Sequence, residues 1–330
     1  MTDNEISTIR GRAARRTLLT AAAGAAALLA TGAAAGPSAA TPPAAPRAGA
    51  GPRGAGPRGA APRGAARRAA AIGQLRALER RHGARLGAVA RNTVTGATVL
   101  YRADERFPMC STFKTLAAAA VLRDLDRHGE VLAKRVRYTR DDLVENSDKA
   151  EEYLATGMTV AELCWAAICF SDNTAANLLL RELGGPAAVT RFCRSLGDGV
   201  TRLDRWEPQL NTAEPWRVED TTTPAAIAGT YERLVLGTAL NRPDRERLTG
   251  WLLANTTSTY RFRAGLPADW RLADKTGGGA YGTNNDVGVA WTPDGAPVVL
   301  AVLTTKPEQD APADNPLVRD TASVLAAAVT

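Results

Sequence analysis

The sequence predicts an α/β protein in which both chain ends form one mainly antiparallel sheet with flanking helices and the middle forms an inserted all-helical domain. Three observations predict this fold class. Strand-like runs occur over 85–102 and again over 271–304. Between 111 and 253, apolar residues recur at helical spacing. Short turn sequences join neighbouring strands, which is typical of antiparallel pairs.

Residues 1–35 have the composition of an export signal. Arg15-Arg16 precedes an Ala/Leu run that contains no acid and ends near Ala35, where small residues offer cleavage sites. The paired arginines favour the twin-arginine route over the general secretory route. An uncleaved membrane anchor is the alternative, but the run is short and Ala is only weakly apolar. We therefore expect an exported protein, secreted or in the cell envelope or periplasm, with no stable membrane association after processing.

Residues 36–70 are rich in Pro, Gly, Ala and Arg, and the sequence GPRGA appears in them twice in succession. Such a segment cannot bury an apolar core, so we expect a flexible or semi-extended linker. The globular domain is therefore expected over 71–330.

The elements of this domain are predicted in chain order. Apolar residues three apart predict a first helix over 72–82. The turn residues Asn92–Gly96 then separate two strands. The expected strands cover 85–91, 97–102, 271–275, 285–292 and 298–304. The other expected helices cover 112–127, 159–167, 173–183, 187–196, 224–236, 243–252 and 315–329.

These elements divide the domain into an α/β part, 71–109 with 254–330, and a helical part, 110–253. A cleft between the two parts collects residues from distant segments, so we expect the chemistry there.

The charge and the rarer residue types exclude several functions. The formal net charge is +7, but residues 1–71 contribute ten arginines and two acids, so the remainder has 31 basic against 32 acidic residues. A basic balance confined to a low-complexity end does not predict nucleic-acid binding. The two histidines, His82 and His128, are expected to be solvated, which argues against a histidine triad or a zinc site. The four cysteines are expected to be mostly buried free thiols.

Ser111 and Lys114 are the first candidate catalytic residues. They lie three apart at a helix start, so their side chains share one face and are expected to meet. A serine nucleophile needs a base, and lysine can serve when burial or positive neighbours lower its pKa. The chain has five lysines against 36 arginines, so a lysine here is informative. The alternative is a helix cap beside a solvated lysine.

Two later segments supply further polar groups. Ser171-Asp172-Asn173 lies at the junction of two expected helices, where the alternative interpretation is a plain helix cap. Lys275-Thr276-Gly277-Gly278 lies on an expected strand whose glycines let a ligand approach the edge, and the alternative there is a strand ending in a glycine turn.

In this order, the three segments resemble the active-site motifs of class A serine β-lactamases and of penicillin-binding proteins. The resemblance covers nearly all of 71–330. It implies a β-lactamase/transpeptidase-like fold and a catalytic domain over 71–330. It also implies a monomeric enzyme that needs no metal or cofactor and whose partner is a small-molecule β-lactam.

The segment from Arg205 to Asn211 separates the two kinds of enzyme. It is similar to the loop that carries the deacylating glutamate of class A enzymes. An acyl-serine is hydrolysed only if a water beside the ester is held and deprotonated, and Glu207 with the Asn211 amide could do both. The alternative is a surface loop with a solvated glutamate.

Other positions also match the family. Arg205 and Asp220 correspond to an ion pair at the neck of this loop, and Asn177 to an asparagine that reaches toward it. Arg261 matches an arginine that helps Thr276 and Lys275 bind the substrate carboxylate.

Some positions depart from the family pattern. Asn146 stands where many members have an aromatic wall, and Ala118 stands opposite Cys164, so a common disulfide cannot form. Cys110 precedes the nucleophile, as in members that hydrolyse carbapenems, but no cysteine follows Lys275 to complete their bridge. This pattern favours penicillins, and some cephalosporins, over carbapenems.

The resemblance implies hydrolysis of the β-lactam amide through an acyl-serine, which gives antibiotic resistance. Ser111 is the expected nucleophile, and its proton passes to Lys114 directly or through a water held by Glu207. The N–H groups of Ser111 and Gly278 are expected to form the oxyanion hole, and Ser171 to relay the proton to the leaving nitrogen. Asn173, Asn211, Thr276, Gly277, Gly278 and Arg261 are the expected substrate-binding residues. The alternatives are a D-Ala-D-Ala carboxypeptidase or transpeptidase and a penicillin-sensing module that acylates without turnover.

Overall fold

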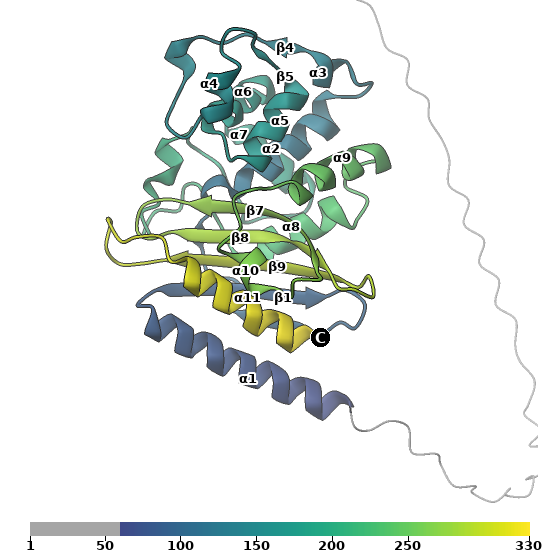
Figure 1. Cartoon of the computed structure of the whole chain (residues 1–330), viewed down its shortest axis with the longest axis vertical. Helices are drawn as coiled ribbons and strands as arrows, with labels where there is room; N and C mark the ends of the chain where they lie inside the picture. The colour runs from purple at the N-terminus through teal and green to yellow at the C-terminus, as the bar shows by residue number, and fades with distance from the viewer. Residues whose placement is uncertain (1–59) are drawn as a thin grey trace, which may run out of the picture. The chain divides into compact units, whose positions relative to one another are not determined.

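The computed structural model describes residues 60–330 (Figure 1). The expected export signal and the first part of the expected linker lie outside the described residues. Within residues 60–330, no helix is long and apolar enough to cross a membrane.

In the described chain, the longer strands lie toward the two ends and most of the helices lie in the middle. The strands are β1 (Arg85–Asn92), β2 (Thr98–Tyr101), β3 (Phe107–Pro108), β4 (Arg135–Val136), β5 (Met158–Thr159), β6 (Thr221–Thr222), β7 (Arg271–Gly278), β8 (Asn284–Trp291) and β9 (Pro297–Thr305). The helices are α1 (Ala60–Arg81), α2 (Phe113–Ala120), α3 (Glu130–Ala133), α4 (Asp148–Glu152), α5 (Val160–Cys169), α6 (Asn173–Leu183), α7 (Ala187–Ser195), α8 (Pro224–Val235), α9 (Arg242–Leu253), α10 (Phe262–Gly265) and α11 (Asn315–Val329). The single turns are η1 (Cys110–Thr112), the π-helical turn η2 (Val121–Leu125), η3 (Arg140–Asp142) and η4 (Gln209–Thr212).

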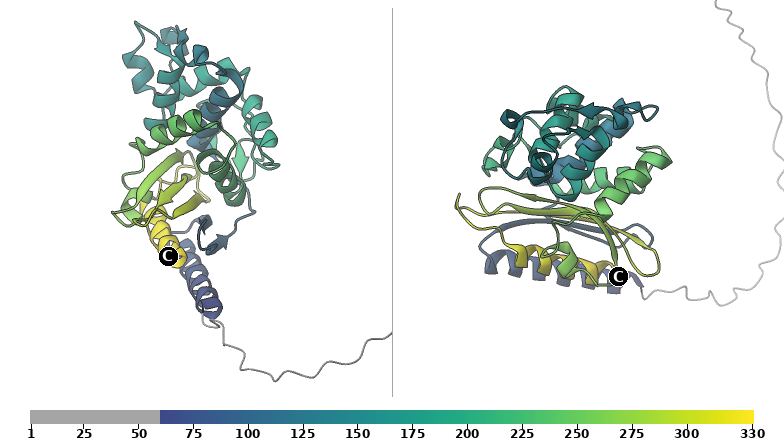
Figure 2. Two further views of the ribbon diagram at one scale, coloured as in Figure 1. Left: turned by 90° about the vertical axis from the view of Figure 1, so that its right-hand side faces the viewer. Right: turned by 45° about the horizontal axis from the view of Figure 1, so that its top comes forward.

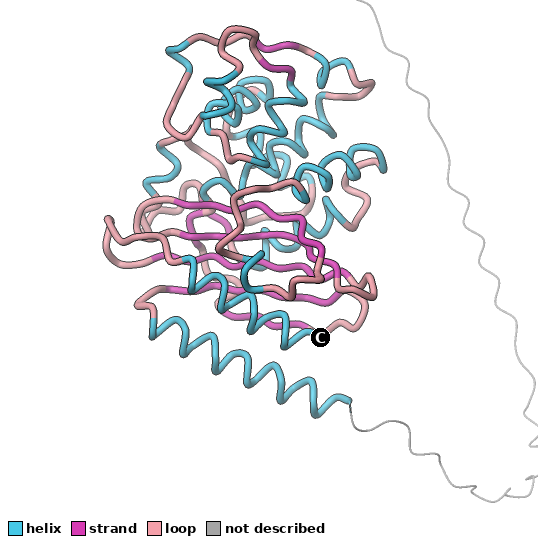
Figure 3. Tube along the Cα trace, viewed as in Figure 1, coloured by secondary structure: helices cyan, strands magenta, loops and turns pink. Residues whose placement is uncertain are grey.

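Strands from both chain ends form one antiparallel sheet, whose strands are magenta in Figure 3. The strand order is β2-β1-β9-β8-β7. The two ends meet where β1 pairs with β9, in a register that runs from Arg85 opposite Thr305 to Asn92 opposite Val298. This arrangement confirms the predicted fold class. Two small sheets, β3 with β6 and β4 with β5, were not predicted, because strands of two residues are too short to show an alternating pattern.

Helices cover both faces of the sheet (Figure 2). Side chains alternate along β7, so that Leu272 belongs to the apolar core under α1, α10 and α11 while Ala273 belongs to the core under α8 and the helical part. Every residue of the helix α2 is buried, as expected for the central helix of a bundle, and apart from Lys114 and Thr115 all of them are apolar. Its N-terminus meets the end of β7, and this junction positions the candidate site.

The structure corrects three expectations. The helix α1 begins at Ala60 rather than at residue 72, so 60–70 is helical and not linker. Ala and Arg are strong helix formers, and Pro62 falls in the first turn, where no hydrogen bond is lost. The helix expected over 112–127 ends at Ala120 and continues only as one π-helical turn. His82 is not solvated, because its Nδ1 lies 3.0 Å from Asp314 Oδ2.

Candidate active site

Ser111 lies in η1, directly before α2, and is almost fully buried. The preceding Cys110 has a left-handed backbone, with φ of 44°. Asn285 of β8 binds the backbone just before η1, because its Nδ2 donates to Pro108 O at 2.9 Å and to Met109 O at 3.3 Å. The nucleophile candidate is therefore tied to the sheet as well as to the central helix.

Lys114 is the second residue of α2, and its side chain is fully buried. Its Nζ donates to Ser171 O at 2.7 Å and to Asn173 Oδ1 at 2.6 Å, and it lies 3.1 Å from Glu207 Oε1. Among residues 60–330, no hydrogen bond joins Lys114 to the Ser111 hydroxyl, so the expected direct contact is absent. The lysine donors are taken by these three acceptors instead.

The Glu207 carboxylate contacts both Ser111 and Lys114. The Ser111 hydroxyl donates to Glu207 Oε1 at 3.4 Å, the same oxygen that Lys114 approaches. The other oxygen, Oε2, accepts from Asn211 Nδ2 at 2.5 Å. The Asn177 side chain fixes the backbone of Glu207, because its Nδ2 donates to Glu207 O at 2.9 Å and its Oδ1 accepts from Glu207 N at 3.0 Å.

The segment that carries Glu207, residues 204–220, is closed at its neck. Arg205 Nε donates to Asp220 Oδ2 at 2.5 Å, which is the ion pair expected from the sequence. The other carboxylate oxygen, Oδ1, accepts from the backbone N–H groups of Asp204 and Arg205. We call this segment the Glu207 loop.

Ser171 lies between the two candidate lysines. Its hydroxyl accepts from Lys275 Nζ at 3.1 Å and from Lys114 Nζ at 3.4 Å. The neighbouring Asp172 caps α6, because its side chain accepts from Ala175 N at 2.8 Å. The cap interpretation is therefore confirmed for Asp172, while the catalytic interpretation of Ser171 stays a prediction.

The end of β7 passes close to η1 because Gly277 and the following glycines have no side chains. A Cβ on Gly277 would lie 2.8 Å from Met109 O, and one on Gly279 would lie 2.6 Å from Asn211 O. Arg261 supports this edge, since its Nη1 donates to Gly277 O and to Asn285 O, each at 2.9 Å. These glycines let η1 and the segment around Asn211 pack directly against the end of β7.

Burial controls the electrostatics of the site. It lowers the pKa of Lys114 below the ordinary lysine value, although the Glu207 carboxylate opposes this shift. Burial also lowers the pKa of Lys275 well below the ordinary value, and the nearby cations Lys114 and Arg261 lower it further. Neutral lysine is a base, so these shifts suit proton transfer.

A cleft of about 590 Å³ opens beside these groups. It is lined by Glu145, Asn146, Pro208, Gln209, Asn211, Thr212, Gly278, Gly279 and Ala280. The Glu207 loop and the end of β7 thus form facing walls.

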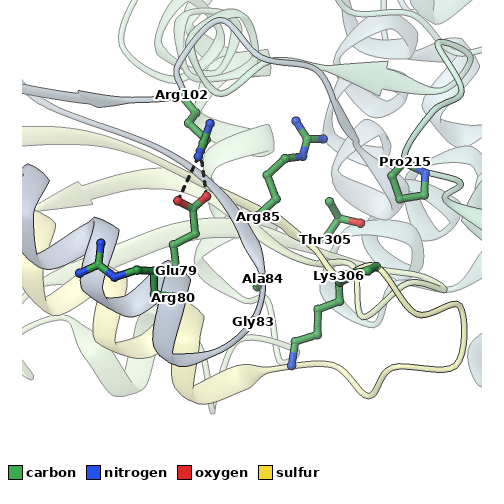
Figure 4. Close-up of a pocket in the computed structure, with 10 residues that line it drawn as sticks. Glu79, Arg80, Gly83, Ala84, Arg85, Arg102, Pro215, Thr305 and Lys306 are labelled. Carbon is green, nitrogen blue, oxygen red and sulfur yellow. Dashed lines mark hydrogen bonds and ion pairs between the residues drawn. The ribbon is translucent and has the colours of Figure 1, made fainter.

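A second hollow, of about 490 Å³, lies between the end of α1, β1 and the chain after β9 (Figure 4). Glu79 and Arg102 face each other in it as an ion pair, and Arg80, Arg85 and Lys306 are also among its lining residues. It contains none of the predicted site residues.

The structure brings the predicted site residues into one region, and it adds three that the sequence did not single out. Tyr231 of α8 donates its hydroxyl to Thr112 O at 2.9 Å, and the Thr257 hydroxyl lies 2.5 Å from the Thr276 hydroxyl. Asn285 is the third. A run of polar residues, Asn284-Asn285-Asp286, inside an apolar strand was the only sequence signal for it.

All four cysteines are buried and free, which confirms the expectation for the thiols. The Cys110 thiol lies next to Gly279, where a Cβ would be 2.9 Å from its Sγ.

Comparison with known proteins identifies the family. Residues 70–329 match the model of the "Beta-lactamase enzyme family". A β-lactamase of Streptomyces lavendulae is 69% identical over 260 residues, which cover 78% of this chain and 85% of that protein. The solved β-lactamase of Streptomyces albus G is 65% identical, has a TM-score of 0.77, and aligns over 78% of this chain and 98% of its own.

Another relative has a name that states its substrate class. A protein of Klebsiella oxytoca named "Carbapenem-hydrolyzing beta-lactamase KPC" is 51% identical over 234 residues, or 71% of this chain and 80% of that protein. Family model, close relatives and solved structures agree with the fold described above, and on these findings the chain belongs to the β-lactamase family, as a class A serine β-lactamase.

Proposed function

We propose that Ser111 is the nucleophile of this β-lactamase and that Glu207 and Lys114 together take its proton. The observation that carries this proposal is the convergence of Ser111 Oγ and Lys114 Nζ on Glu207 Oε1, at 3.4 Å and 3.1 Å. The hydroxyl already donates to the carboxylate, so the proton has a short path away from the oxygen that attacks the lactam carbonyl. The lowered pKa of Lys114 supports the lysine as a second acceptor.

The carbonyl oxygen becomes negative in the tetrahedral intermediate. The backbone N–H groups of Ser111 and Gly278 are the donors proposed for it, because η1 and the end of β7 lie against each other at Gly277. Such donors act in a site from which most water is excluded, where one donor contributes about 10²–10³-fold in kcat.

The C–N bond of the lactam then breaks, and the nitrogen needs a proton. Ser171 is placed to give it, because its hydroxyl accepts from both Lys275 and Lys114. Two ammonium donors leave the hydroxyl proton free to point into the cleft. A proton given by Ser171 is replaced by one from a lysine.

Deacylation releases the ring-opened acid. Glu207 and the Asn211 amide, joined at 2.5 Å, are proposed to hold and deprotonate the attacking water. This pair is also the feature that favours hydrolysis over the two rival functions, since a peptidase or a sensor is trapped as a stable acyl-enzyme.

The substrate carboxylate is proposed to bind at Thr276, Lys275 and Arg261, with Asn173 and Gly277 contacting other parts of the substrate. Arg261 is anchored by two carbonyls, which holds its guanidinium beside the β7 edge. We propose penicillins, and some cephalosporins, as preferred substrates over carbapenems. Cys110 has no cysteine opposite it, because the position next to its thiol is Gly279.

We also propose that the protein is exported by a twin-arginine signal and acts as a monomer outside the cytoplasm. The paired arginines of residues 15 and 16 support the route.

The experiment follows the ultraviolet loss of benzylpenicillin added in about hundredfold excess to the purified protein. Complete loss supports turnover by the proposed mechanism. Loss that stops after one equivalent means that an acyl-enzyme accumulates, and the roles proposed for Glu207 and Asn211 are then wrong. A Ser111→Ala variant, which lacks the nucleophile, is the control and should leave the drug intact.

A further inference from the structure

Two carboxyl groups are buried behind the site, and the proposed mechanism does not use them. Asp274 immediately precedes Lys275 in β7, and Asp286 lies in β8 opposite Thr276. Both side chains are inaccessible to solvent. Side chains two residues apart on a strand share a face, so the two carboxyls are diagonal neighbours on the face that packs against α10.

Gly288 makes room for this pair. It lies opposite Asp274, and a Cβ there would be 2.8 Å from Asp274 Cβ and 2.4 Å from Ala273 O. With no side chain at 288, nothing on β8 stands opposite Asp274, and its carboxyl has room to lie beside that of Asp286.

A hydrogen bond between two carboxyls requires a proton on one of them. Asp274 has other donors, Asn255 Nδ2 at 3.0 Å and Arg263 Nη2 at 3.4 Å. Asp286 Oδ2 accepts from Phe262 N at 3.2 Å, but its Oδ1 meets no N–H or hydroxyl group in residues 60–330. A proton on Asp286, donated to Asp274, would give this buried oxygen the partner that it lacks.

The carboxyl pair holds both ends of one segment. Asn255 is bound by Asp274 and Phe262 by Asp286, so residues 255–262 are fixed at two points. This segment, which we call the Arg261 segment, carries Arg261 and Thr257 to the edge of β7.

The charges around the pair agree with one retained proton. Burial raises the pKa of Asp274, and it raises the pKa of Asp286 well above the ordinary aspartate value, to which the neighbouring Asp274 charge adds. The cations that act on the pair are Arg261, Arg263 and Lys275, of which Lys275 points to the opposite face of the sheet, where the Tyr231 phenol also lies. With one proton the pair carries a single negative charge beside these cations, and loss of that proton would place two negative charges together in the core.

We infer that Asp286 is a positioning residue for β-lactam binding: it donates its proton to Asp274, and the resulting pair fixes the Arg261 segment so that Arg261 meets the substrate carboxylate. The inference rests on the proposed role of Arg261. Asp286 itself touches no part of the proposed substrate position, so it acts only through the segment.

The first test is spectroscopic and does not depend on activity. Infrared difference spectra at neutral pH, taken between the wild type and Asp286→Asn, should show a protonated carboxyl band that the variant lacks. Asp198→Asn is the matched control, since Asp198 is another buried aspartate, held by Thr201 and Thr230 and remote from the pair. A missing band in the wild type, or one that survives in Asp286→Asn, overturns the inference.

The second test separates positioning from folding. Asp286→Val removes the hydrogen bonds and should raise KM for benzylpenicillin by about tenfold with little change in kcat, the scale of one hydrogen bond to a charged group. Asp286→Asn should restore KM, because its amide donates to Asp274 in place of the carboxyl proton. Loss of kcat with unchanged KM, or no rescue by asparagine, overturns the positioning role. Arg261→Ala, measured alongside, shows separately whether the proposed carboxylate contact exists.

Discussion

Replacing Glu207 by alanine should separate the two halves of the proposed reaction. The carboxylate contacts Ser111, Lys114 and Asn211, so its loss removes the base for hydrolysis and leaves the nucleophile and the lysine in place. A positioned general base contributes roughly 10²–10⁴-fold. We expect the acyl-enzyme to form, with Lys114 taking the serine proton, and turnover to slow by about that factor.

The same change should also alter stability. Lys114 Nζ lies 3.1 Å from Glu207 Oε1, and both side chains have 0% exposure. Removing one partner of a buried ion pair costs about 3–5 kcal/mol of unfolding free energy. At about 2–4 °C per kcal/mol for a domain of this size, the melting temperature should fall by roughly 6–20 °C.

This cost should depend on pH, because Lys114 can lose its proton instead of remaining an unpaired buried charge. The pKa of Lys114 in the folded protein lies below its ordinary value, so the folded state binds fewer protons than the unfolded state between the two values. Stability then rises with pH through that window. The deficit of Glu207→Ala relative to the wild type should be largest at acidic pH and shrink toward alkaline pH.

The assay mixes the variant with benzylpenicillin, follows the covalent adduct by intact-protein mass spectrometry and measures released product in parallel. Glu214→Ala is the matched control, because Glu214 lies in the same loop but contacts Thr212, Arg217 and, at 3.7 Å, Arg205 instead of Ser111 or Lys114. Product release from Glu207→Ala at the control rate refutes the assigned role. A variant that forms no adduct refutes the separation of the two steps.

Other predictions follow from single contacts. Arg261→Ala should raise KM for penicillin much more than it lowers kcat, because its proposed contact exists throughout the reaction; steady-state kinetics decide, and an unchanged KM contradicts it. Gly288→Ala should destabilise the protein by about 1–3 kcal/mol in denaturant titrations, since the new Cβ meets Asp274 and Ala273 O, and wild-type stability would refute this packing. Asn146→Tyr should lower KM by adding a stacking surface to the cleft wall, whereas Asn146→Gly should not. All four cysteines should resist a thiol reagent until unfolding, because burial raises each thiol pKa, that of Cys193 to about 12; rapid labelling of the folded protein would be the contrary result.

The large elements were predictable because each repeats its own pattern over many residues. The predicted bounds of α6 and α11 agree with the structure, those of β1 differ by one residue at one end, and those of β9 differ by one residue at each end. The start of α1 was missed because Gly and Pro in 60–70 indicated a linker, although a single glycine costs a helix only about 1 kcal/mol. Composition therefore predicted the wrong state where helix formers and helix breakers were mixed.

The candidate site was predictable only where its residues form local motifs. Ser111, Lys114 and Glu207 lie in such motifs, and the structure brings them together, while their roles remain proposals. Asn285 and Asp286 had no motif, because their importance comes from contacts with segments far away in the chain. The contact expected between Ser111 and Lys114 was mispredicted for the same reason. Helical spacing predicted a direct contact, but acceptors from other elements took the lysine donors.

The left-handed backbone conformations around the site are also set by contacts with distant segments. Among residues 60–330, seven non-glycine residues have a left-handed backbone, and all but Arg102 lie in segments that form or adjoin the site: Cys110, Asn146, Ser171, Ala213, Asp220 and Tyr281. Each such residue costs about 1–2 kcal/mol and persists only where surrounding contacts impose it. At Ser171 the imposing contact is Lys114, which binds its carbonyl oxygen at 2.7 Å. The buried lysine thus fixes the position of the proposed proton donor before any substrate binds, and local sequence preferences could not have predicted a conformation that they oppose.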